Sequence, residues 1–455
     1  LEKTNVAGTT SAVDAAVAAA VVLAFVAGSV RAPYVRWRTF EVRLALLGAA
    51  TALVLASAAR RPAPRWGGVV IAAGLAARLA FLAQEPSDDV HRYLWEGKVQ
   101  RAGVNPYAVA PSDPSLASLR GEGWKDVNHP EWTAIYGPVA EGLFAATPSW
   151  RAWKTVVVAA DLVAIALLLR LLEARSLSPL WAAGYALHPL VLWSGAGEGH
   201  LESLVAAAVL AAVLAIDRGR PVAAGVLVGT AVLVKATAGV FAIVLLCSRG
   251  PLRSIPALAA TAVAGYLPYA GAGAALFASL LRFGGEMRSG AMLPLGPWAA
   301  PAGLAVAAAL CRRTGADPSS VALHVAGATI LLSPTVHPWY GVVLAALCPL
   351  SPGTVWWIPT LTLVALGETT AGLRATGGWI EAPWLRLAVY GPFLLAVLLR
   401  IDRRAFLAVV GAALVAIAGW VAWHPSVQEI LGTGGQWRSE TLAARVEGSK
   451  GRRDE

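Results

Sequence analysis

The sequence predicts an all-α polytopic membrane protein, because the chain is apolar throughout, carries few charges and repeats runs of membrane-spanning length. Of its 455 residues, 57% are hydrophobic and 14% are charged, whereas roughly 25% of residues are charged in an ordinary soluble domain. Apolar runs of about 20 residues, each long enough to cross about 30 Å of hydrocarbon, recur from end to end. We therefore expect about 12 to 14 transmembrane helices and exclude a soluble enzyme.

The expected spans lie on both sides of one long polar stretch. Their ranges are 13–30, 42–59, 66–83, 153–172, 180–197, 201–216, 222–247, 255–270, 298–311, 320–336, 339–351, 354–367, 384–400 and 405–423. The chain accordingly divides into N-terminal spans over 1–83, a loop over 84–152, the remaining transmembrane bundle over 153–423 and a polar tail over 424–455. We expect the tail to be poorly ordered, because it is polar and of mixed charge.

The positive net charge reflects membrane topology. The chain has 37 Lys plus Arg against 27 Asp plus Glu, a net charge of +10, which on its own would also suit a nucleic-acid-binding protein. Most of these cations, however, form short clusters at the ends of apolar runs, such as Arg218/Arg220 and Arg249/Arg253. Because cations are retained on the cytoplasmic side during insertion, the long loop then lies on the exoplasmic face. The four arginines within 31–43 do not fit this orientation.

The stretch 222–247 has Lys235 in its middle, with Arg220 before it and Arg249 after it. A lysine in hydrocarbon costs at least a few kcal/mol unless it reaches water or an anion. Basic residues at both ends favour two half-length helices that enter and leave on the cytoplasmic side. The alternative is one tilted helix whose lysine faces a wet interior. In both cases we expect Lys235 to face a cavity.

The long loop opens with the sequence SDDVHRYLWEGKVQRAGVNPYAVAP, from Ser87 to Pro111. Ser87 or Asp88 can cap a following helix whose apolar residues fall roughly on one face, and Gly103 would end that helix. Such a helix is suited to lying in the membrane interface. We expect a second interfacial helix after Asn128-His129-Pro130, carrying Trp132, Ile135, Tyr136, Val139 and Leu143. The two helices would form a cap on the exoplasmic surface.

The adjacent carboxylates Asp88 and Asp89 follow shortly after an apolar span. They can form the acidic first turn of the helix, where the helix dipole stabilises them by under about 1 kcal/mol. A partly desolvated carboxylate at an interface can also act as a general base, while its neighbour orients the incoming hydroxyl or the substrate. The residue types alone leave both interpretations open.

Two further turns on the predicted exoplasmic side carry polar residues. Glu198, His200 and Glu202 lie in the sequence GAGEGHLES between two expected spans, and His337 and Tyr340 follow a proline. These residues can form satisfied polar turns or interfacial anchors. They can also line a pocket, as polar residues at the mouth of a membrane cavity often do.

Four segments of the chain resemble integral-membrane glycosyltransferases of the GT-C superfamily. They are DDVHRYLWEGKVQRAGVNPY, NHPEWTAIYGPVAEGLF, VLVKATAG and SPTVHPWY, and the two loop segments are the most specific. The closest likeness is to bacterial members related to the GPI-type and other polyprenyl-phosphomannose-dependent mannosyltransferases. GPI-type enzymes show a spaced acidic pair where this chain has adjacent acids, and family members often have two prolines near Tyr136, where Gly137-Pro138 stands here.

The resemblance implies a membrane glycosyltransferase that moves a hexose, with mannose favoured, from a polyprenyl monophosphate carrier to a hydroxyl of a lipid-linked or envelope glycan acceptor. Transfer would invert the anomeric centre, with Asp88 or Asp89 as the base. Cations near this base would stabilise the charge that develops on the phosphate. The candidates for binding the donor phosphate are Arg92, Lys98, Lys235 and His337.

Each of the main cations also has a simpler explanation. Arg92 can form an ion pair within its helix, and Lys235 can extend to the nearer membrane interface. The remaining residues that we expect in the substrate pocket are Tyr93, His129, Tyr136, Glu198, His200 and Tyr340.

The expected setting is a bacterial-type inner (plasma) membrane, which the protein crosses many times, with the active site on the exoplasmic side. The partners would be the polyprenyl-phosphate sugar donor, the lipid-linked or glycan acceptor and membrane lipids, and not nucleic acid. We expect no metal and no cofactor, since no metal-ligand spacing and no nucleotide-binding loop is found. The alternative is a polytopic lipid or sugar transporter or flippase, although the sequence lacks a convincing internal repeat. A noncatalytic scaffold is a third possibility.

Overall fold

The computed structural model describes residue 51 and residues 67–121, 123–292, 317–367, 369, 381 and 383–400. Residues 1–393 form one compact unit and residues 394–455 form another. Every predicted site residue lies in the first unit. The spans expected at 13–30, 298–311 and 405–423, almost all of the span at 42–59, the arginines within 31–43 and the tail at 424–455 lie outside the described residues.

The described part of the chain is built from helices and loops and contains no strand; its isolated β-bridge joins Ser289 and Thr335. The predicted all-α fold class is confirmed. The α-helices are α3 (Gly67–Leu82), α4 (Asp88–Arg101), α5 (Pro138–Ala146), α6 (Trp150–Ala174), α7 (Ala183–Ala186), α8 (Pro189–Val191), α9 (Glu202–Asp217), α10 (Pro221–Val234), α11 (Ala242–Cys247), α12 (Pro251–Tyr266), α13 (Ala278–Glu286), α15 (Pro318–Leu332), α16 (Gly341–Leu347), α17 (Trp357–Thr362) and α19 (Pro383–Leu398). The short 3-10 or π segments are η2 (Pro114–Leu119), η3 (Trp124–Asp126), η4 (Pro179–Ala182), η5 (Leu192–Gly197), η6 (Ala236–Phe241), η7 (Leu267–Phe277), η8 (Pro338–Tyr340), η9 (Cys348–Leu350) and η10 (Leu363–Leu366).

Two helical stretches among the described residues are long and apolar enough to cross a membrane. They are α6 and the stretch Pro251–Glu286, in which α12, η7 and α13 follow one another. A third candidate is the pair Pro189–Gly197 and Glu202–Asp217, which is bent by 118° at its break. The remaining apolar helices have 10–17 residues. The helices support a membrane protein, while a total of about 12 to 14 spans stays a prediction.

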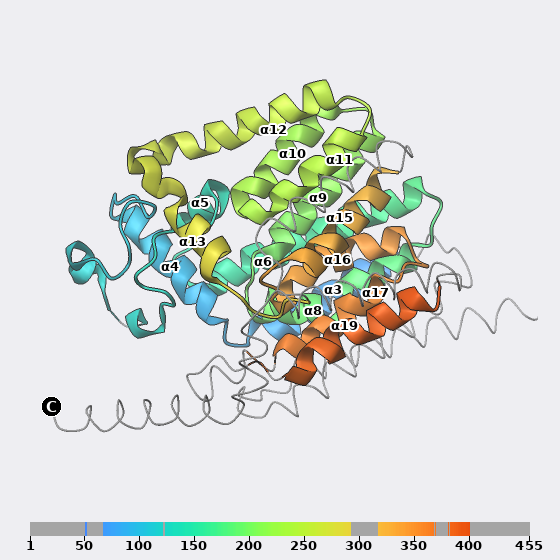
Figure 1. Cartoon of the computed structure of the whole chain (residues 1–455), viewed down its shortest axis with the longest axis horizontal. Coiled ribbons are helices and arrows are strands. Elements are labelled where there is room, and N and C mark those ends of the chain that lie inside the picture. The colour runs from blue at the N-terminus through green and yellow to red at the C-terminus, as the bar shows by residue number, and fades with distance from the viewer. Residues whose placement is uncertain are drawn as a thin grey trace, which may run out of the picture. The chain divides into compact units, whose positions relative to one another are not determined.

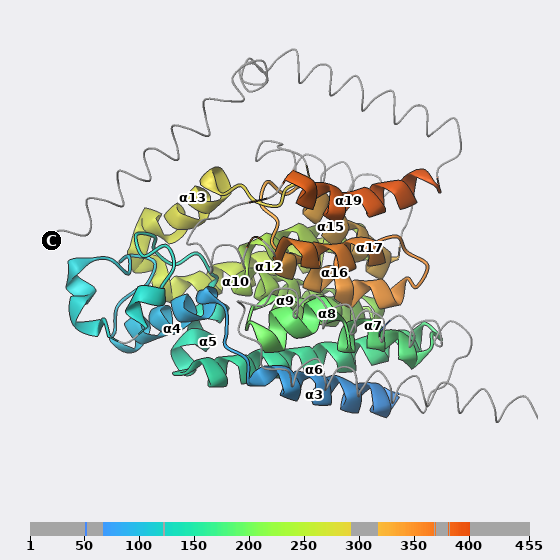
Figure 2. The same ribbon diagram turned by 90° about the horizontal axis from the view of Figure 1, so that it is seen from below.

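Helices α3, α6, α9, α10 and α12 pack side by side in that order (Figures 1 and 2). Helices α10 and α12 approach each other closely, since a Cβ atom on Gly225 would lie 2.1 Å from the carbonyl oxygen of Ser254. Small residues at such contacts let helix backbones approach each other, which matters in lipid because apolar side chains gain little by leaving it. Glycine at this position therefore sets the spacing of α10 and α12.

A buried ion pair joins α3 to α6. The Nε atom of Arg78 lies 2.9 Å from Asp161 Oδ2, and both side chains are fully buried. The Tyr185 hydroxyl donates to the other Asp161 oxygen at 2.6 Å, and Arg78 also donates to the Ala186 carbonyl at 2.7 Å. Each charge therefore has an opposite charge and further hydrogen bonds, as charges inside a membrane protein require. No local pattern in the sequence indicates this pair.

The stretch 222–247 is broken at Lys235 into two half-length helical segments. Helix α10 ends at Val234, Lys235 has an extended backbone with φ −146° and ψ 120°, and η6 and α11 follow. The two segments run back to the same level, since Gly250 packs against Pro221 at the start of α10. Of the two predicted arrangements, the structure has the half-length pair, with Lys235 where they meet.

The cap formed by the long loop agrees with the sequence in its first helix and differs in its second. Helix α4 starts at Asp88 and stops before Gly103, whose φ is 80°. The second helix, α5, starts only at Pro138. The expectation that Trp132, Ile135 and Tyr136 belong to it is wrong. Their backbone makes tertiary contacts instead: the Tyr107 hydroxyl donates to the Tyr136 carbonyl at 2.6 Å, and Pro138 suits the first helical position.

Candidate active site

A cavity of about 440 Å³ lies between α4, the loop before α5, α13 and the chain around Lys235 and His337. Of the predicted site residues, those that line it are Asp88, Asp89, Arg92, Tyr93, His129, Tyr136, Lys235, His337 and Tyr340. Leu280, Phe283 and Met287 form an apolar part of its wall. The structure thus brings the acidic pair, the lysine of the broken span and the polar turn at His337 into one chamber.

Lys154 on α6 fixes the chain just before the acidic pair. This lysine is fully buried, and its Nζ donates to the carbonyls of Phe81, Leu82 and Gln84 at 3.2, 3.1 and 2.7 Å. It thereby satisfies carbonyl groups that the end of α3 leaves without helical partners. Ser87 is the N-cap residue of α4, but its side chain makes no capping hydrogen bond. Contacts with α6 therefore direct the entry into α4.

Asn128 connects the two acids of the pair. Its Nδ2 group donates to Asp88 Oδ2 at 3.1 Å and to Asp89 Oδ1 at 2.9 Å. A neutral amide between two carboxylates orients both of them and relieves part of their repulsion. The sequence predicts Asn128 only as part of the segment that precedes the second helix, because nothing in the sequence reveals which carboxylates its amide will meet.

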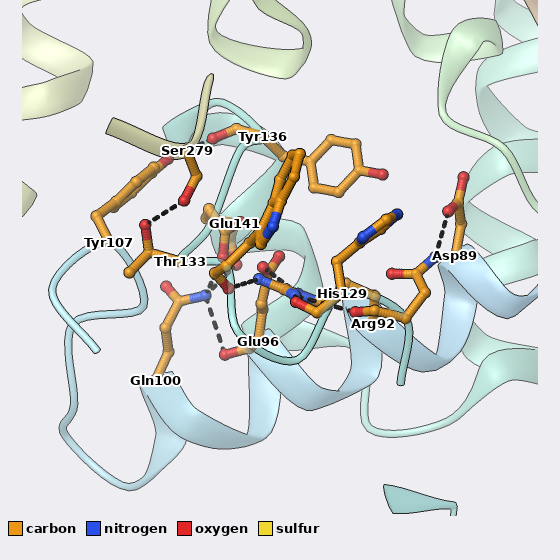
Figure 3. A network of polar contacts seen from close by, with 12 residues as sticks. Asp89, Arg92, Glu96, Gln100, Tyr107, His129, Thr133, Tyr136, Glu141 and Ser279 are labelled. Atoms are coloured by element: carbon orange, nitrogen blue, oxygen red, sulfur yellow. Dashed lines mark hydrogen bonds and ion pairs between the residues drawn. The ribbon is translucent and has the colours of Figure 1, made fainter. Parts of the chain in front are cut away.

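Arg92 is buried below the loop that carries Asn128 (Figure 3). Its Nε donates to Glu96 Oε1 at 2.7 Å. Its terminal nitrogens donate to the carbonyls of Asn128, His129 and Trp132 at 3.2, 2.8 and 2.6 Å. The intrahelical ion pair that the spacing allowed is therefore present, and the guanidinium also binds the loop beside the acidic pair. Its predicted contact with a donor phosphate stays a prediction.

His200 lies behind the acidic pair rather than in the cavity wall. Its Nδ1 is 3.3 Å from Asp89 Oδ2 and its Nε2 is 3.1 Å from Glu198 Oε2. The imidazole ring stacks on Trp339 with 3.7 Å between ring centroids. Glu198 is fully buried. Glu198 and His200 thus reach the cavity through Asp89, since neither side chain is among those that line it.

The contacts between His200 and Asp89 stabilise the charged forms of both. Burial on its own would lower the pKa of His200, but hydrogen bonds and charge from Asp89 and Glu198 raise it to about 9. Burial would likewise raise the pKa of Asp89, but hydrogen bonds from His200 and Asn128 and the charge of His200 lower it to about 2. At neutral pH the three groups therefore form a carboxylate–imidazolium–carboxylate series.

Lys235 reaches the cavity from the break in its span. Its Nζ pairs with Glu202 Oε1, and it lies 4.2 Å from the centre of the Tyr340 ring. Lys235 and Glu202 both line the cavity. Glu202 is therefore the counter-ion of Lys235. It is not among the site residues that the sequence predicts. A cation held over an aromatic face and beside a carboxylate is oriented without being removed from the cavity.

His337 is the third predicted phosphate ligand, and it is neutral at pH 7. Its ring stacks on Trp339 with 4.6 Å between centroids, and burial lowers its pKa to about 3. A neutral imidazole can donate one N–H to a phosphate oxygen, while Lys235 supplies the charge.

A smaller cavity of about 80 Å³ adjoins the first. The two share Glu202, Lys235, Thr237 and Tyr340, and the side chains that line the rest of the smaller one are mainly apolar. Lys98, the remaining candidate cation, does not line either cavity and donates to the Leu119 carbonyl. Within the described residues, no group of three or more His, Cys, Asp or Glu side chains is arranged to hold a metal ion.

Two comparisons with known proteins show which family the chain resembles. Residues 129–287 match glycosyltransferase family 87. The alpha-(1->6)-mannopyranosyltransferase A of Mycobacterium tuberculosis (strain ATCC 25618 / H37Rv) is 32% identical over 171 residues, which are 34% of this chain and 31% of the relative. The chain thus matches about a third of the length of that relative. No solved structure matches the chain. Over this part of the chain, the resemblance to membrane mannosyltransferases of the GT-C type is confirmed.

Proposed function

We propose that the protein transfers a hexose, with mannose favoured, from a polyprenyl monophosphate carrier to a hydroxyl of a lipid-linked or envelope glycan acceptor. The observation that carries this proposal is that Asp88, Asp89, Lys235 and His337 line a single cavity. The family 87 region and the mannosyltransferase relative support the reaction class and the sugar. The basic clusters of the sequence favour an exoplasmic site in a bacterial-type plasma membrane.

The proposed reaction forms a bond between the acceptor oxygen and the anomeric carbon while the bond from that carbon to the phosphate oxygen breaks. Attack from the face opposite the phosphate inverts the anomeric centre. The leaving phosphate keeps the electron pair, and an aspartate takes the proton of the acceptor hydroxyl. The Asn128 amide binds both Asp88 and Asp89, so either carboxylate can accept the proton while the other orients the acceptor hydroxyl.

The cations are suited to the phosphate end of the donor. Negative charge grows on the phosphate as the glycosidic bond breaks, and preorganised cations stabilise it most in a site that excludes water. Lys235 can supply such charge once the phosphate replaces Glu202 as its partner, and His337 can add a neutral hydrogen bond. Arg92 contributes its positive charge from below the acidic pair, although four hydrogen bonds already hold its guanidinium.

The test uses the full-length protein purified in lipid nanodiscs and given radiolabelled polyprenyl-phosphate mannose together with a membrane lipid extract. We expect release of free polyprenyl phosphate and label in an acceptor glycolipid. Polyprenyl-phosphate glucose serves as the comparison donor. Movement of intact donor across a proteoliposome membrane without its consumption would instead identify a transporter or flippase. If the donor is neither consumed nor moved, the noncatalytic scaffold is the interpretation that remains.

A further inference from the structure

A buried polar network connects α4 to α5 below the cavity (Figure 3). Glu96 and Glu141 are 2% and 0% exposed. Glu96 accepts the hydrogen bond from Arg92. Glu141 Oε2 accepts from Gln100 Nε2 at 2.8 Å, and Gln100 Oε1 accepts from the Tyr269 hydroxyl at 2.8 Å. The carboxyl groups of Glu96 and Glu141 are thus both buried in this network. The Arg92 guanidinium joins the network to the loop that carries Asn128.

The surroundings of Glu141 favour its protonated form. Burial raises the pKa of Glu141 well above its usual value, and the charge of Glu96 and a hydrogen bond with Glu96 raise it further. A protonated Glu141 can donate to the Glu96 carboxylate that pairs with Arg92, so the two carboxyl groups can share one proton. The other groups that face Glu141 are the phenols of Tyr107, Tyr266 and Tyr269, and α10, which packs on α5, carries no ionisable side chain.

We propose that Glu96 and Glu141 are positioning residues for the acidic pair, which they hold in place through Arg92 and Asn128. Glu96 fixes the Arg92 guanidinium, and this binds the carbonyls of Asn128, His129 and Trp132. His129 has φ 42°, a conformation that a side chain other than glycine rarely adopts without support from its surroundings. The loop so held presents the Asn128 amide to both aspartates. The proposal rests on the function proposed above, in which those aspartates serve the transfer.

The first test compares Glu96→Gln and Glu141→Gln with Arg101→Gln. Arg101 is a matched control, because it also joins α4 to α5, through the Phe144 and Ala145 carbonyls, but does not contact Arg92. Glu96→Gln removes the negative charge that pairs with Arg92 and should lower kcat by about 10- to 100-fold with donor KM changed less than about threefold, as expected when reacting groups are misplaced. Arg101→Gln should leave kcat unchanged. An equal loss of kcat in Glu96→Gln and Arg101→Gln would show that the packing of α4 on α5 matters and the contact with Arg92 does not.

Glu141→Gln tests the shared proton without disturbing the shape of the side chain. A glutamine can donate to Glu96 and accept from Gln100 as the protonated acid does. The wild-type network should weaken as pH rises through the pKa of Glu141, so kcat should fall at alkaline pH. Glu141→Gln should keep the neutral-pH kcat and show a smaller alkaline decline than the wild type, and the decline that remains follows the loss of charge on His200. An alkaline decline in Glu141→Gln as large as that of the wild type would contradict the shared proton.

A double-mutant cycle tests whether the effect passes through Asn128. In an Asn128→Ala background, the further fall in kcat from Glu96→Gln should disappear, since the route to the aspartates has been removed. A fall of the same size in both backgrounds would overturn the proposal.

Hydrogen exchange provides a measurement that does not depend on sugar transfer. Amide exchange in residues 128–132 should speed up by about tenfold in Glu96→Gln and stay unchanged in Arg101→Gln. A protein that shows this difference yet transfers no sugar would refute the proposed function and leave the network intact. Unchanged exchange in Glu96→Gln, in a protein that does transfer sugar, would refute the network alone.

Discussion

Asp88 and Asp89 share one amide donor, and Asp89 has in addition the His200 ring at 3.3 Å. The two acids are therefore neighbours in sequence with different surroundings, a situation in which one group can accept a proton while the other stays ionised. Asp89 contacts His200, which in turn contacts Glu198. Neither His200 nor Glu198 lines the cavity.

Replacing either aspartate by asparagine keeps its size and removes its charge. Asp88→Asn and Asp89→Asn should each lower kcat by about 100-fold or more, the usual contribution of a general base and its partner. Membrane insertion should stay close to that of the wild type for both variants. The melting temperature should stay unchanged for Asp88→Asn and fall for Asp89→Asn, which also loses the ion pair with His200. The assay is release of polyprenyl phosphate; full activity of both variants would remove the catalytic assignment.

The His200 imidazolium should make the enzyme sensitive to alkaline pH. Its pKa rises from 6.5 to about 9 on folding, so its stabilising contribution is complete below about 6.5 and is lost as pH rises through about 9. The melting temperature of the wild type should therefore fall across this range more steeply than that of His200→Gln. Parallel curves for the two proteins, measured by differential scanning fluorimetry, would argue against the charged histidine.

Glu202 and a donor phosphate would compete for Lys235. Removing the carboxylate charge with Glu202→Gln should lower donor KM by about fivefold, the effect of about 1 kcal/mol on an equilibrium constant. Lys235→Met should raise KM instead, because the cation is lost. Steady-state kinetics with varied donor measures both, and a change in the same direction for the two variants would contradict the competition.

At the scale of elements, the position of the acidic pair depends on how α3 ends. Its last carbonyls are bound by Lys154 from α6, so the chain reaches α4 in a fixed direction. The same pair of helices is joined deeper in the bundle by Arg78 and Asp161. Both contacts join the α3 segment to α6 through buried polar groups.

Lys154→Met tests this link. The methionine fills the space but leaves buried carbonyl oxygens without donors, which should lower the free energy of unfolding by about 1–3 kcal/mol. Activity should fall as well, because α4 carries the acidic pair. Lys98→Met, on an exposed face of α4, serves as the control and should be neutral within about 0.5 kcal/mol. Equal stability of both variants, from chemical denaturation in detergent, would show that Lys154 does not hold α3.

Several elements could be predicted from the sequence for local physical reasons. Helix α4 follows from its apolar pattern and the glycine after it, and the break at Lys235 follows from basic residues on both sides of an apolar stretch. The start of α5 could not be predicted, because Tyr107 competes for the backbone of Tyr136 only in the folded chain. Secondary structure set by tertiary hydrogen bonds leaves no periodic signal in the sequence.

At the scale of the whole molecule, composition was sufficient for the all-α membrane class, and motif order was sufficient for the enzyme superfamily. The partners of the site residues were not predictable. Asn128 meets Asp88 from 40 positions away and Glu202 meets Lys235 across 33, separations that no local pattern encodes. The acids and cations of the site could be predicted from residue types, whereas which acid pairs with which cation depends on how the helices pack.

The membrane orientation can be tested by cysteine labelling of intact cells. In a background with the three native cysteines replaced by alanine, Ser112→Cys on the exposed cap should react with a membrane-impermeant maleimide added outside. Arg218→Cys, at the end of α9, should react only after the membrane is opened, since cationic turns stay in the cytoplasm. The reverse pattern would place the acidic pair on the cytoplasmic face.

The carboxylate beside Lys235 also bears on how a reaction cycle ends. Spent carrier phosphate is more negative than the esterified donor, so it would hold an unopposed lysine more strongly than the donor does. Because Glu202 lies beside it, the Lys235 ammonium can exchange the phosphate for a carboxylate and is never left without an anion in a poorly hydrated site. Glu202 would then take the place of the departing carrier phosphate at Lys235. The same side chain that slows binding of the next donor would therefore speed release of the spent carrier.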